Sequence, residues 1–299
     1  MTEGTHWNVI INESTCFARS WKKWLDLFEK NHIWYAAWQT NSLEQLSDVL
    51  AECLNKGGRN FLFCGGDGTL HHGGNLLIQQ AGEECQTITI GVLPCGTGND
   101  WVRTFGITRS RVIAALRMNK TEPLHLIKVT WPDGRSKYAF NMVGGALDAA
   151  VVNELLKSKV NIPGSLKYPI GLLKTLMKPH QWHGAIKIDG VDFNGQWLTI
   201  QAGFGKYCGG GMYVLPHTQS DHAGLLLMRP KSMLQLLLSL PKLYNGKVGQ
   251  QEEAIALYFS TMEILNDGVP FEADGEWLGE SPLTLTTSLG VFQRLAVSK

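Results

Sequence analysis

Short apolar runs alternate with segments of helical periodicity along the first 123 residues. The runs lie at residues 6–12, 33–40, 60–64 and 88–94, and each has the length of one buried strand. Segments of helical periodicity fill the stretches between them, as in units that alternate a strand with a helix. The pattern predicts a parallel sheet covered by helices.

Two of the intervening segments have a clear apolar face. In the first, apolar residues recur at spacings of three and four, so one side of a helix is buried. In the second, Ser42 is placed to cap a helix that Gly57 and Gly58 end. The apolar positions are Phe17, Trp21, Trp24, Leu25 and Phe28 in the first segment and Leu46, Val49, Leu50, Cys53 and Leu54 in the second.

From about residue 124 the pattern changes to the alternation that is typical of antiparallel strands. We therefore predict two domains, at 1–123 and 124–286, and the C-terminal end, about 287–299, can return to the first domain. Hairpin-forming pairs punctuate the second domain. These pairs are Asp133-Gly134, Asp189-Gly190, Asn194-Gly195 and Asp267-Gly268.

Bulk composition narrows the class of protein. The chain has 299 residues, 44% of them hydrophobic, and a formal net charge of +1, which is not the basic balance of a nucleic-acid binder. The N-terminus lacks a basic segment followed by an apolar one, and no apolar run reaches the roughly 18 residues that cross a bilayer. We expect a cytoplasmic protein that does not bind nucleic acid.

Cysteine usage agrees with that location. No two cysteines form a Cys-x-x-Cys pair, and most lie inside apolar runs. We expect buried free thiols in a reducing compartment. The six residues are Cys16, Cys53, Cys64, Cys85, Cys95 and Cys208.

Two glycine-rich turns carry the candidate chemistry. The segments FCGGDGTLHHGGNLL at 63–77 and CGTGND at 95–100 each follow a short apolar strand. Such turns lie at the carboxyl edge of a parallel sheet, and their backbone N–H groups suit phosphate oxygens. No G-x-x-x-x-G-K-[ST] segment supplies a loop lysine, so Mg²⁺ would have to offset the phosphate charge. Asp67 is the candidate to hold that ion, directly or through water.

These two turns form part of a recognisable set of motifs. GGDGT at 65–69, LPCGTGND at 93–100 and DGE at 274–276 together resemble the diacylglycerol kinase catalytic-domain superfamily. That superfamily includes bacterial diacylglycerol-kinase-like lipid kinases, sphingosine and ceramide kinases and, more distantly, NAD kinases. Further similarity at 140–152 and 209–212 extends the resemblance over nearly the whole chain.

The resemblance implies a fold and two ligands. It implies an N-terminal, NAD-kinase-like α/β domain that binds ATP with Mg²⁺, and a C-terminal, mostly antiparallel β-sandwich domain for the lipid substrate, with the active site in the cleft between them. By motif position, the residues expected to touch ATP are Asn12, Thr40, Gly65, Gly66, Asp67, Gly68, Thr69, Thr97 and Asn99.

The resemblance also implies a catalytic group. In the family the Asp-Gly-Glu turn supplies the acceptor for the lipid hydroxyl proton, which points to Glu276 with Asp274 beside it. Asp67 is the second choice, because some relatives assign that role to the aspartate of the glycine turn. A positioned general base typically contributes about 10²–10⁴-fold to a rate.

Two departures from the family pattern affect the predicted sites. The family usually has Asn-Pro after its first strand, whereas this chain has Asn12-Glu13, which adds a negative charge near the nucleotide. Bacterial members also carry an aspartate that binds a structural Mg²⁺, and here His222 stands at that position, beside Asp221. Neutral histidine is a poor ligand for a hard cation, so the structural site is an open question.

Two interpretations stay open for the basic residues. Arg103 could contact a phosphate or could form an ion pair with Asp100. The stretch 155–178 has five lysines and no acid, and it could lie against an anionic membrane or cover the second domain's sheet as an ordinary amphipathic helix.

The combined pattern favours an ATP- and Mg²⁺-dependent lipid kinase of phospholipid metabolism. Its acceptor would be a hydroxyl of diacylglycerol or a related amphiphile, met at the inner face of the membrane by a peripheral protein without a transmembrane segment. The alternatives are a kinase for a soluble alcohol such as NAD, and a non-catalytic nucleotide- or lipid-binding regulator. The acceptor lipid and the oligomeric state cannot be read from these residues.

Overall fold

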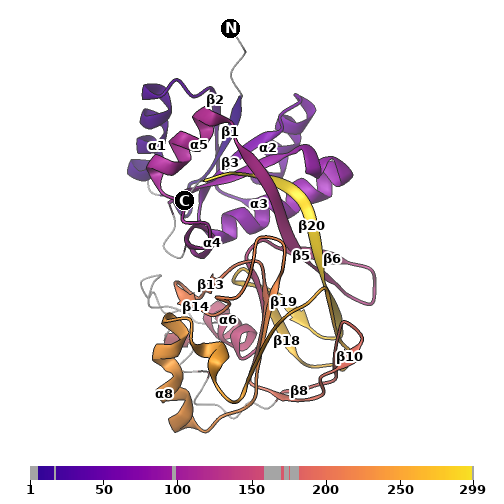
Figure 1. The fold of residues 1–299 in the computed structure, drawn as a ribbon. Coiled ribbons are helices and arrows are strands. Elements are labelled where there is room, and N and C mark those ends of the chain that lie inside the picture. The colour runs from indigo at the N-terminus through magenta and orange to yellow at the C-terminus, as the bar shows by residue number, and fades with distance from the viewer. Residues whose placement is uncertain are drawn as a thin grey trace. The chain divides into compact units, whose positions relative to one another are not determined.

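The chain is described by a computed structural model that covers residues 6–16, 18–95, 99–157, 170–171, 175 and 182–297. It divides into two compact units (Figure 1). The first unit contains residues 1–124 and 289–299, and the second contains residues 125–288.

The first unit is built on a parallel sheet. Its strands are β1 (Trp7–Asn12), β2 (Tyr35–Thr40), β3 (Asn60–Gly65) and β4 (Thr89–Pro94), in the spatial order β4-β3-β1-β2. The C-terminal part of β20 (Leu283–Leu295) extends the sheet beyond β4, with Gln293 opposite Thr89 in parallel register. The predicted α/β class is therefore confirmed for this unit.

Helices of the first unit lie in two pairs. Figure 1 shows α1 (Ala18–Lys30) beside α5 (Arg109–Met118), and α2 (Leu43–Asn55) beside α3 (Asp67–Ala81). Between α1 and α5, the guanidinium of Arg109 lies 5.7 Å from the ring centroid of buried Trp24. Ser42 caps α2 as predicted, because its hydroxyl accepts the backbone N–H of Gln45. Two shorter helices complete the unit, η1 (Gly82–Thr87) and α4 (Asp100–Thr104).

The second unit is an antiparallel β-sandwich, as the resemblance implied. One sheet has the strand order β16-β15-β12-β7-β18-β19, and the other contains β10, β9, β17 and the N-terminal part of β20, with β5 and β6 paired at its side. The strands are β5 (Thr121–Thr130), β6 (Ser136–Ala139), β7 (Met142–Ala146), β8 (Trp182–Gly184), β9 (Ile186–Ile188), β10 (Val191–Asp192), β11 (Gly195–Trp197), β12 (Thr199–Gly203), β13 (Tyr207–Cys208), β14 (Met212–Tyr213), β15 (Gly224–Met228), β16 (Ala254–Tyr258), β17 (Thr261–Ile264), β18 (Pro270–Ala273) and β19 (Glu276–Glu280), and the helices are α6 (Leu147–Lys157), α8 (Met233–Tyr244) and η2 (Val248–Gln250).

Strand β15 shows how the sandwich is covered on both faces. Successive side chains of a strand point to opposite faces. Leu225 and Leu227 belong to the core between the two sheets. Leu226 and Met228 belong to a second apolar cluster, against which Leu243 of α8 packs. Every residue of this strand is buried because both of its faces are covered.

Hairpin turns are only partly as predicted. Asp189-Gly190 joins the antiparallel strands β9 and β10, with φ of +47° and +84°, and the expected hairpin is confirmed there. Asp267-Gly268 lies between β17 and β18, which belong to different sheets, so the hairpin predicted at that pair is wrong. An Asp-Gly pair reports the backbone conformation of a turn and does not report whether the flanking strands pair.

Candidate active site

The two glycine turns begin at the same edge of the first unit's sheet. Strands β3 and β4 are neighbours in parallel register, with Gly65 opposite Pro94. The backbone N–H of Cys95 donates to the carbonyl of Gly65 at 3.1 Å. The starting points of both predicted phosphate turns are thus adjacent. Thr97 and its flanking glycines, residues 96–98, lie outside the described residues.

Asp67 connects the two turns. It lies in the first turn of α3, and its Oδ2 and Oδ1 atoms accept the backbone N–H groups of Asp100 and Trp101, each at 3.0 Å. These donors belong to the first turn of α4, where N–H groups lack partners within the helix and a negative charge is favourable. One role of the carboxylate in the glycine turn is therefore to hold the helix that follows the second turn.

Asn12 and Thr69 lie beside the first turn. The side-chain amide of Asn12 donates to the Thr69 hydroxyl at 3.0 Å. A Cβ atom on Gly65 would collide with the side chain of Thr69, so only glycine fits there. Gly66 caps α3 and Gly68 lies in its first turn. The structure therefore groups these predicted nucleotide residues around the end of β3.

Thr40 ends β2, and Asn99 directly precedes α4. The Thr40 carbonyl accepts the N–H of Glu13 at 3.0 Å, and the Thr40 side chain is buried. Asn99 precedes α4 with φ of +54°, in the left-handed region. The alternative of an ion pair for Arg103 is the one found here, because its Nη1 atom lies 2.7 Å from Oδ1 of Asp100.

Asp274 anchors the segment that leads into β7. Its Oδ1 atom accepts the N–H groups of Asn141 and Met142 at 2.8 and 3.0 Å, and its Oδ2 atom accepts that of Phe140 at 2.8 Å. Its backbone has φ of +55°, which aspartate tolerates better than most residues. The carboxylate of Asp274 therefore has a positioning role in this structure.

Glu272 was not predicted, and it lies next to the Asp-Gly-Glu turn. The side chain is buried in β18, and its Oε2 atom accepts the N–H of Gly275 at 2.7 Å. Burial raises the pKa of Glu272 well above its ordinary value of 4.5, and the negative charges of Asp148, Asp274 and Glu276 raise that pKa further. Glu276 begins β19 and is half-buried. The turn therefore carries a buried acid of raised pKa beside the predicted base.

Asp148 is a second unpredicted acid in the same unit. It is buried in the first turn of α6 and accepts a short hydrogen bond from the Thr199 hydroxyl. A Cβ atom on Gly144 would collide with Oε1 of Glu272 and come within 3.0 Å of the Cβ of Asp148. Glycine at 144 therefore lets the two acids approach. For Glu272 the sequence did hold a signal, because PFEA at 270–273 places one acid in an otherwise apolar strand just before Asp274.

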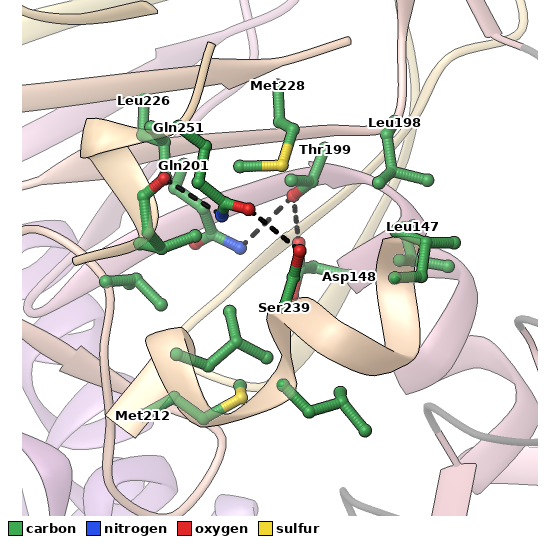
Figure 2. A pocket seen from close by; sticks show the side chains of 15 residues that line it. Leu147, Asp148, Leu198, Thr199, Gln201, Met212, Leu226, Met228, Ser239 and Gln251 are labelled. Atoms are coloured by element: carbon green, nitrogen blue, oxygen red, sulfur yellow. Dashed lines mark hydrogen bonds between the residues drawn. The ribbon is translucent and has the colours of Figure 1, made fainter. Parts of the chain in front are cut away.

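A cavity of about 70 Å³ lies in the second unit under α8 (Figure 2). One wall carries Asp148, Thr199 and Gln201, and the amide nitrogen of Gln201 donates to the Thr199 hydroxyl at 3.4 Å. Among the residues that the structure describes, none makes a hydrogen bond to the buried Oε1 atom of Gln201. The remaining lining residues are Leu147, Leu198, Met212, Val214, Leu226, Met228, Leu236, Ser239, Leu240, Leu243, Val248 and Gln251. Such a mostly apolar space with one open acceptor suits the apolar part of an amphiphile.

The outer face of α8 is also apolar. Leu234 and Leu238 are each 68% exposed, and Leu237 is 42% exposed. Of the basic stretch predicted at 155–178, residues 158–169, 172–174 and 176–178 lie outside the described residues. Within the described parts of the chain, no helix is both long and apolar enough to cross a membrane.

The segment expected to hold a structural Mg²⁺ has a different arrangement. The Asp221 carboxylate lies 2.7 Å from Nδ1 of His222, and both side chains are exposed. This hydrogen bond lowers the pKa of Asp221. In the ranges that the structure covers, the one group of three metal-ligating side chains lies elsewhere, at Cys16, Cys64 and Cys95.

The expectation of six free thiols is wrong for two of these cysteines. Cys16 and Cys95 form a disulfide, and Cys53, Cys64, Cys85 and Cys208 are free. In the sheet, β1 and β4 lie on either side of β3, so Cys16 after β1 and Cys95 after β4 come close at one edge of the sheet. The spacing of the two cysteines in the sequence does not reveal this contact.

Both halves of the chain match known domain families. Residues 6–129 match the diacylglycerol kinase catalytic domain, and residues 141–295 match the YegS C-terminal NAD kinase beta sandwich-like domain. The chain belongs to the diacylglycerol kinase-like lipid kinase superfamily. The resemblance predicted from the three motifs is thereby confirmed.

Individual relatives of this lipid kinase chain are distant. It is 27% identical over 256 residues to a protein of Mycobacterium tuberculosis named diacylglycerol kinase, covering 83% of this chain and 80% of the relative. It is 25% identical to a Pseudomonas aeruginosa protein named "Probable lipid kinase YegS-like", covering 82% and 79%. A crystal structure of a diacylglycerol kinase from Bacillus anthracis has the same fold, with a TM-score of 0.72 at 16% identity over 100% of both chains.

Membership of the lipid kinase superfamily defines the reaction class. The chain is a phosphotransferase with an alcohol group as acceptor.

Proposed function

We propose that this lipid kinase transfers the γ-phosphoryl group of ATP to a hydroxyl of diacylglycerol or a related amphiphilic lipid, in the presence of Mg²⁺. The observation that carries the proposal is the pair of hydrogen bonds from Asp100 and Trp101 to Asp67, since they join the two glycine turns into one assembly. Because the two turns start at the same edge of the sheet, they are better placed to bind one triphosphate together than to bind two separate ligands.

The nucleotide end of the proposal is supported by residues around β3. Backbone N–H groups at the starts of helices favour phosphate oxygens, and α3 starts within the first turn. Asn12 and Thr69 supply polar side-chain atoms beside it. We assign the ATP contacts to Asn12, Thr40, Gly65, Gly66, Asp67, Gly68, Thr69, Thr97 and Asn99.

The residues near the turns suit Mg²⁺ in donor type. Mg²⁺ prefers oxygen ligands, and a carboxylate such as that of Asp67 can bind a cation while it also accepts backbone N–H groups. Bound Mg²⁺ would neutralise charge on the phosphate oxygens. Asp67 therefore has two compatible roles, one structural and one in holding the cation.

Glu276 is the proposed general base. The alcohol must lose its proton as it attacks phosphorus, and a half-buried carboxylate can accept that proton. Three backbone donors occupy the neighbouring Asp274, which favours a positioning role for it. Glu272 is buried and its Oε2 atom already accepts the N–H of Gly275, so it is less accessible to a lipid hydroxyl than the half-buried Glu276.

The cavity under α8 is the proposed site for the apolar end of the lipid. An engineered cavity of about 150 Å³ binds benzene, so a cavity of about 70 Å³ has room for the end of a hydrocarbon chain and not for all of it. The unpaired Oε1 atom of Gln201 would accept a hydrogen bond from a hydroxyl or amide of the amphiphile.

Access to a lipid requires contact with a membrane surface. Leu234, Leu237 and Leu238 give α8 an exposed apolar face, and burying one such side chain is worth about 1.5–3 kcal/mol. We infer a cytoplasmic protein that binds peripherally to the inner face of the membrane through this helix.

The test is ATP consumption by the purified chain with and without mixed micelles of diacylglycerol. Lipid-stimulated turnover, with a phosphorylated lipid identified by mass spectrometry, is the expected result. Turnover that needs only a soluble alcohol such as NAD would replace the lipid assignment. ATP binding without turnover under every condition would indicate a regulator.

A further inference from the structure

Three sulfur atoms meet at the carboxyl edge of the first unit's sheet. Cys16 follows β1, Cys64 lies near the end of β3, and Cys95 follows β4. Cys16 and Cys95 are joined in a disulfide, and the Sγ of Cys64 lies 3.2 Å from that of Cys95 and 3.6 Å from that of Cys16. The proposed function uses none of these groups.

The disulfide links two segments of the proposed nucleotide site. Cys16 ends a turn in which its own N–H donates to the Asn12 carbonyl at 3.0 Å. Cys95 donates its N–H to the Gly65 carbonyl and directly precedes the second glycine turn in the sequence. Because β3 separates β1 from β4, the bond crosses the end of β3 and restrains the turns on both sides.

The three sulfurs differ in access. Cys16 is 2% exposed and Cys64 is fully buried, whereas Cys95 is partly exposed. Of the three residues, Cys95 is therefore the most accessible to a small oxidant in solution. Reversible disulfides with a regulatory role require such an accessible thiol next to a resolving one.

We propose that Cys16 and Cys95 form a reversible regulatory disulfide that a hydroperoxide closes and a dithiol opens. The Cys95 thiolate attacks a peroxide oxygen, the O–O bond breaks, and a sulfenic acid forms with release of one water from hydrogen peroxide. The Cys16 sulfur then attacks Cys95 Sγ, the S–S bond forms, and the sulfenic oxygen leaves as a second water. Two thiols lose two electrons and two protons, and the peroxide gains them.

Cys64 is a positioning residue for this chemistry. Burial raises the pKa of its thiol to about 12, so the group stays protonated at neutral pH. A protonated thiol 3.2 Å from the Cys95 sulfur can donate a hydrogen bond to the Cys95 thiolate. That donation stabilises the reactive form of Cys95.

The regulatory consequence concerns nucleotide affinity and rests on the proposed function. In the disulfide form, the bond from Asn12 to Thr69 and the cap on α4 by Asp67 are both in place. A cross-link between the segment after β1 and the segment after β4 lowers the cost of ordering them when ATP arrives. Oxidation should therefore tighten ATP binding, by about fivefold or more if the coupling is of ordinary size.

The first experiment maps the disulfide in the full chain. The protein is reduced with dithiothreitol, exposed to hydrogen peroxide, blocked with an alkylating reagent, digested without reduction and analysed by mass spectrometry. We expect a linked peptide pair containing Cys16 and Cys95 in the wild type and in Cys208→Ser, and its absence in Cys16→Ser and Cys95→Ser. An oxidised wild type without this link, or a reduced protein that holds zinc on the three thiolates, overturns the proposal.

A second experiment tests the role of Cys64. The rate of link formation with hydrogen peroxide is measured against pH in the wild type, Cys64→Ala and Cys64→Ser. Loss of a hydrogen bond to a charged sulfur should slow the reaction by about tenfold in the alanine variant. Serine keeps a donor and should restore much of the rate. Equal rates in all three proteins contradict the assignment of Cys64.

Calorimetric titration with ATP and Mg²⁺ tests the regulatory half. The oxidised wild type should have the lower Kd, and Cys95→Ser should have the Kd of the reduced protein under both conditions. An equal or higher Kd after oxidation overturns the regulation. If ATP binds in neither state, the proposed function fails, while peptide mapping has already decided independently whether the disulfide forms.

Discussion

The carboxylate of Asp67 accepts the backbone N–H of Trp101 at 3.0 Å. Trp101 is almost fully buried, so this hydrogen bond connects the turn after β3 to a well-packed residue of α4. A second hydrogen bond, from Asp100, occupies the other oxygen of the same carboxylate. A charge that looks out of place in a phosphate-binding turn therefore has a structural reason to be there.

Replacing this carboxylate should affect both stability and turnover. In Asp67→Asn, one oxygen is replaced by an amide donor that faces a backbone N–H, so the α4 cap is half lost. We expect the free energy of unfolding to fall by about 1–2 kcal/mol and kcat to fall by about 10²-fold or more. Urea unfolding and ATP turnover measure the two effects. Asp48→Asn, at an exposed position of α2, should change neither quantity.

The two acids of the Asp-Gly-Glu turn should respond differently. Asp274→Ala removes the acceptor of three backbone N–H groups and places alanine at a positive φ, so we expect a loss of about 3 kcal/mol or more in stability. Glu276→Gln should leave the free energy of unfolding within about 0.5 kcal/mol and lower kcat by about 10²–10⁴-fold. Near-normal turnover in Glu276→Gln would remove it as the base.

Glu272 should make stability depend on pH. Because its pKa is raised in the folded state, the ionised form is disfavoured there. Below the ordinary pKa of 4.5, the Glu272 carboxyl is protonated in both the folded and the unfolded state, and it costs no stability. As the pH rises from 4.5 through the raised pKa of the folded state, the free energy of unfolding falls by up to about 1.4 kcal/mol per pH unit. Glu272→Gln should therefore gain stability relative to the wild type with increasing pH.

Urea unfolding from about pH 4 to about pH 8 measures that difference. Glu280→Gln, at an exposed position of β19, is the control and should parallel the wild type. A constant gap between wild type and Glu272→Gln over the whole range would contradict a raised pKa.

Filling the cavity under α8 should impair the use of lipid and spare the nucleotide. Leu240 lines the cavity, and Leu240→Trp would occupy the space from the helix side. We expect KM for the lipid to rise by about tenfold or more, since the loss of contact with even one methylene is worth about 1–3 kcal/mol. Leu265→Trp, at an exposed position just after β17 and away from α8, is the control. Unchanged lipid kinetics in Leu240→Trp would place the acyl chain elsewhere.

The outer leucines of α8 should determine membrane binding. Leu238→Glu removes an exposed apolar side chain and adds a charge, so partitioning onto anionic phospholipid vesicles should fall by about tenfold or more. Leu43→Glu, at a position of comparable exposure on α2, should partition like the wild type. Vesicle sedimentation makes the comparison. Equal partitioning of both variants would exclude α8 as the contact surface.

Local patterns predicted the strands and helices because those patterns are set by near neighbours in the chain. The apolar run before Gly65 and the cap at Ser42 are two examples, and both depend on residues a few positions apart. Motif spacing likewise brought out the two glycine turns, whose strands pair directly. The family could therefore be predicted from the sequence.

Relationships between distant residues could not be predicted in the same way. The pKa of Glu272 is raised only because folding buries it and places it beside Asp148 and the Asp-Gly-Glu turn. The bond between Cys16 and Cys95 depends on a strand order that differs from the order in the chain. Asp67 was expected to serve a cation, and its hydrogen bonds to α4 depend on the backbone path of the second turn.

Strand β20 has a consequence for biogenesis. Residues 289–299 belong to the first unit, and Gln293 pairs with Thr89 on the outer edge of β4. During synthesis on the ribosome, that edge has no partner until residues 289–295 have been translated. An unpaired strand edge is a template for aggregation, so a nascent chain that stalls before this stretch should be especially dependent on chaperones.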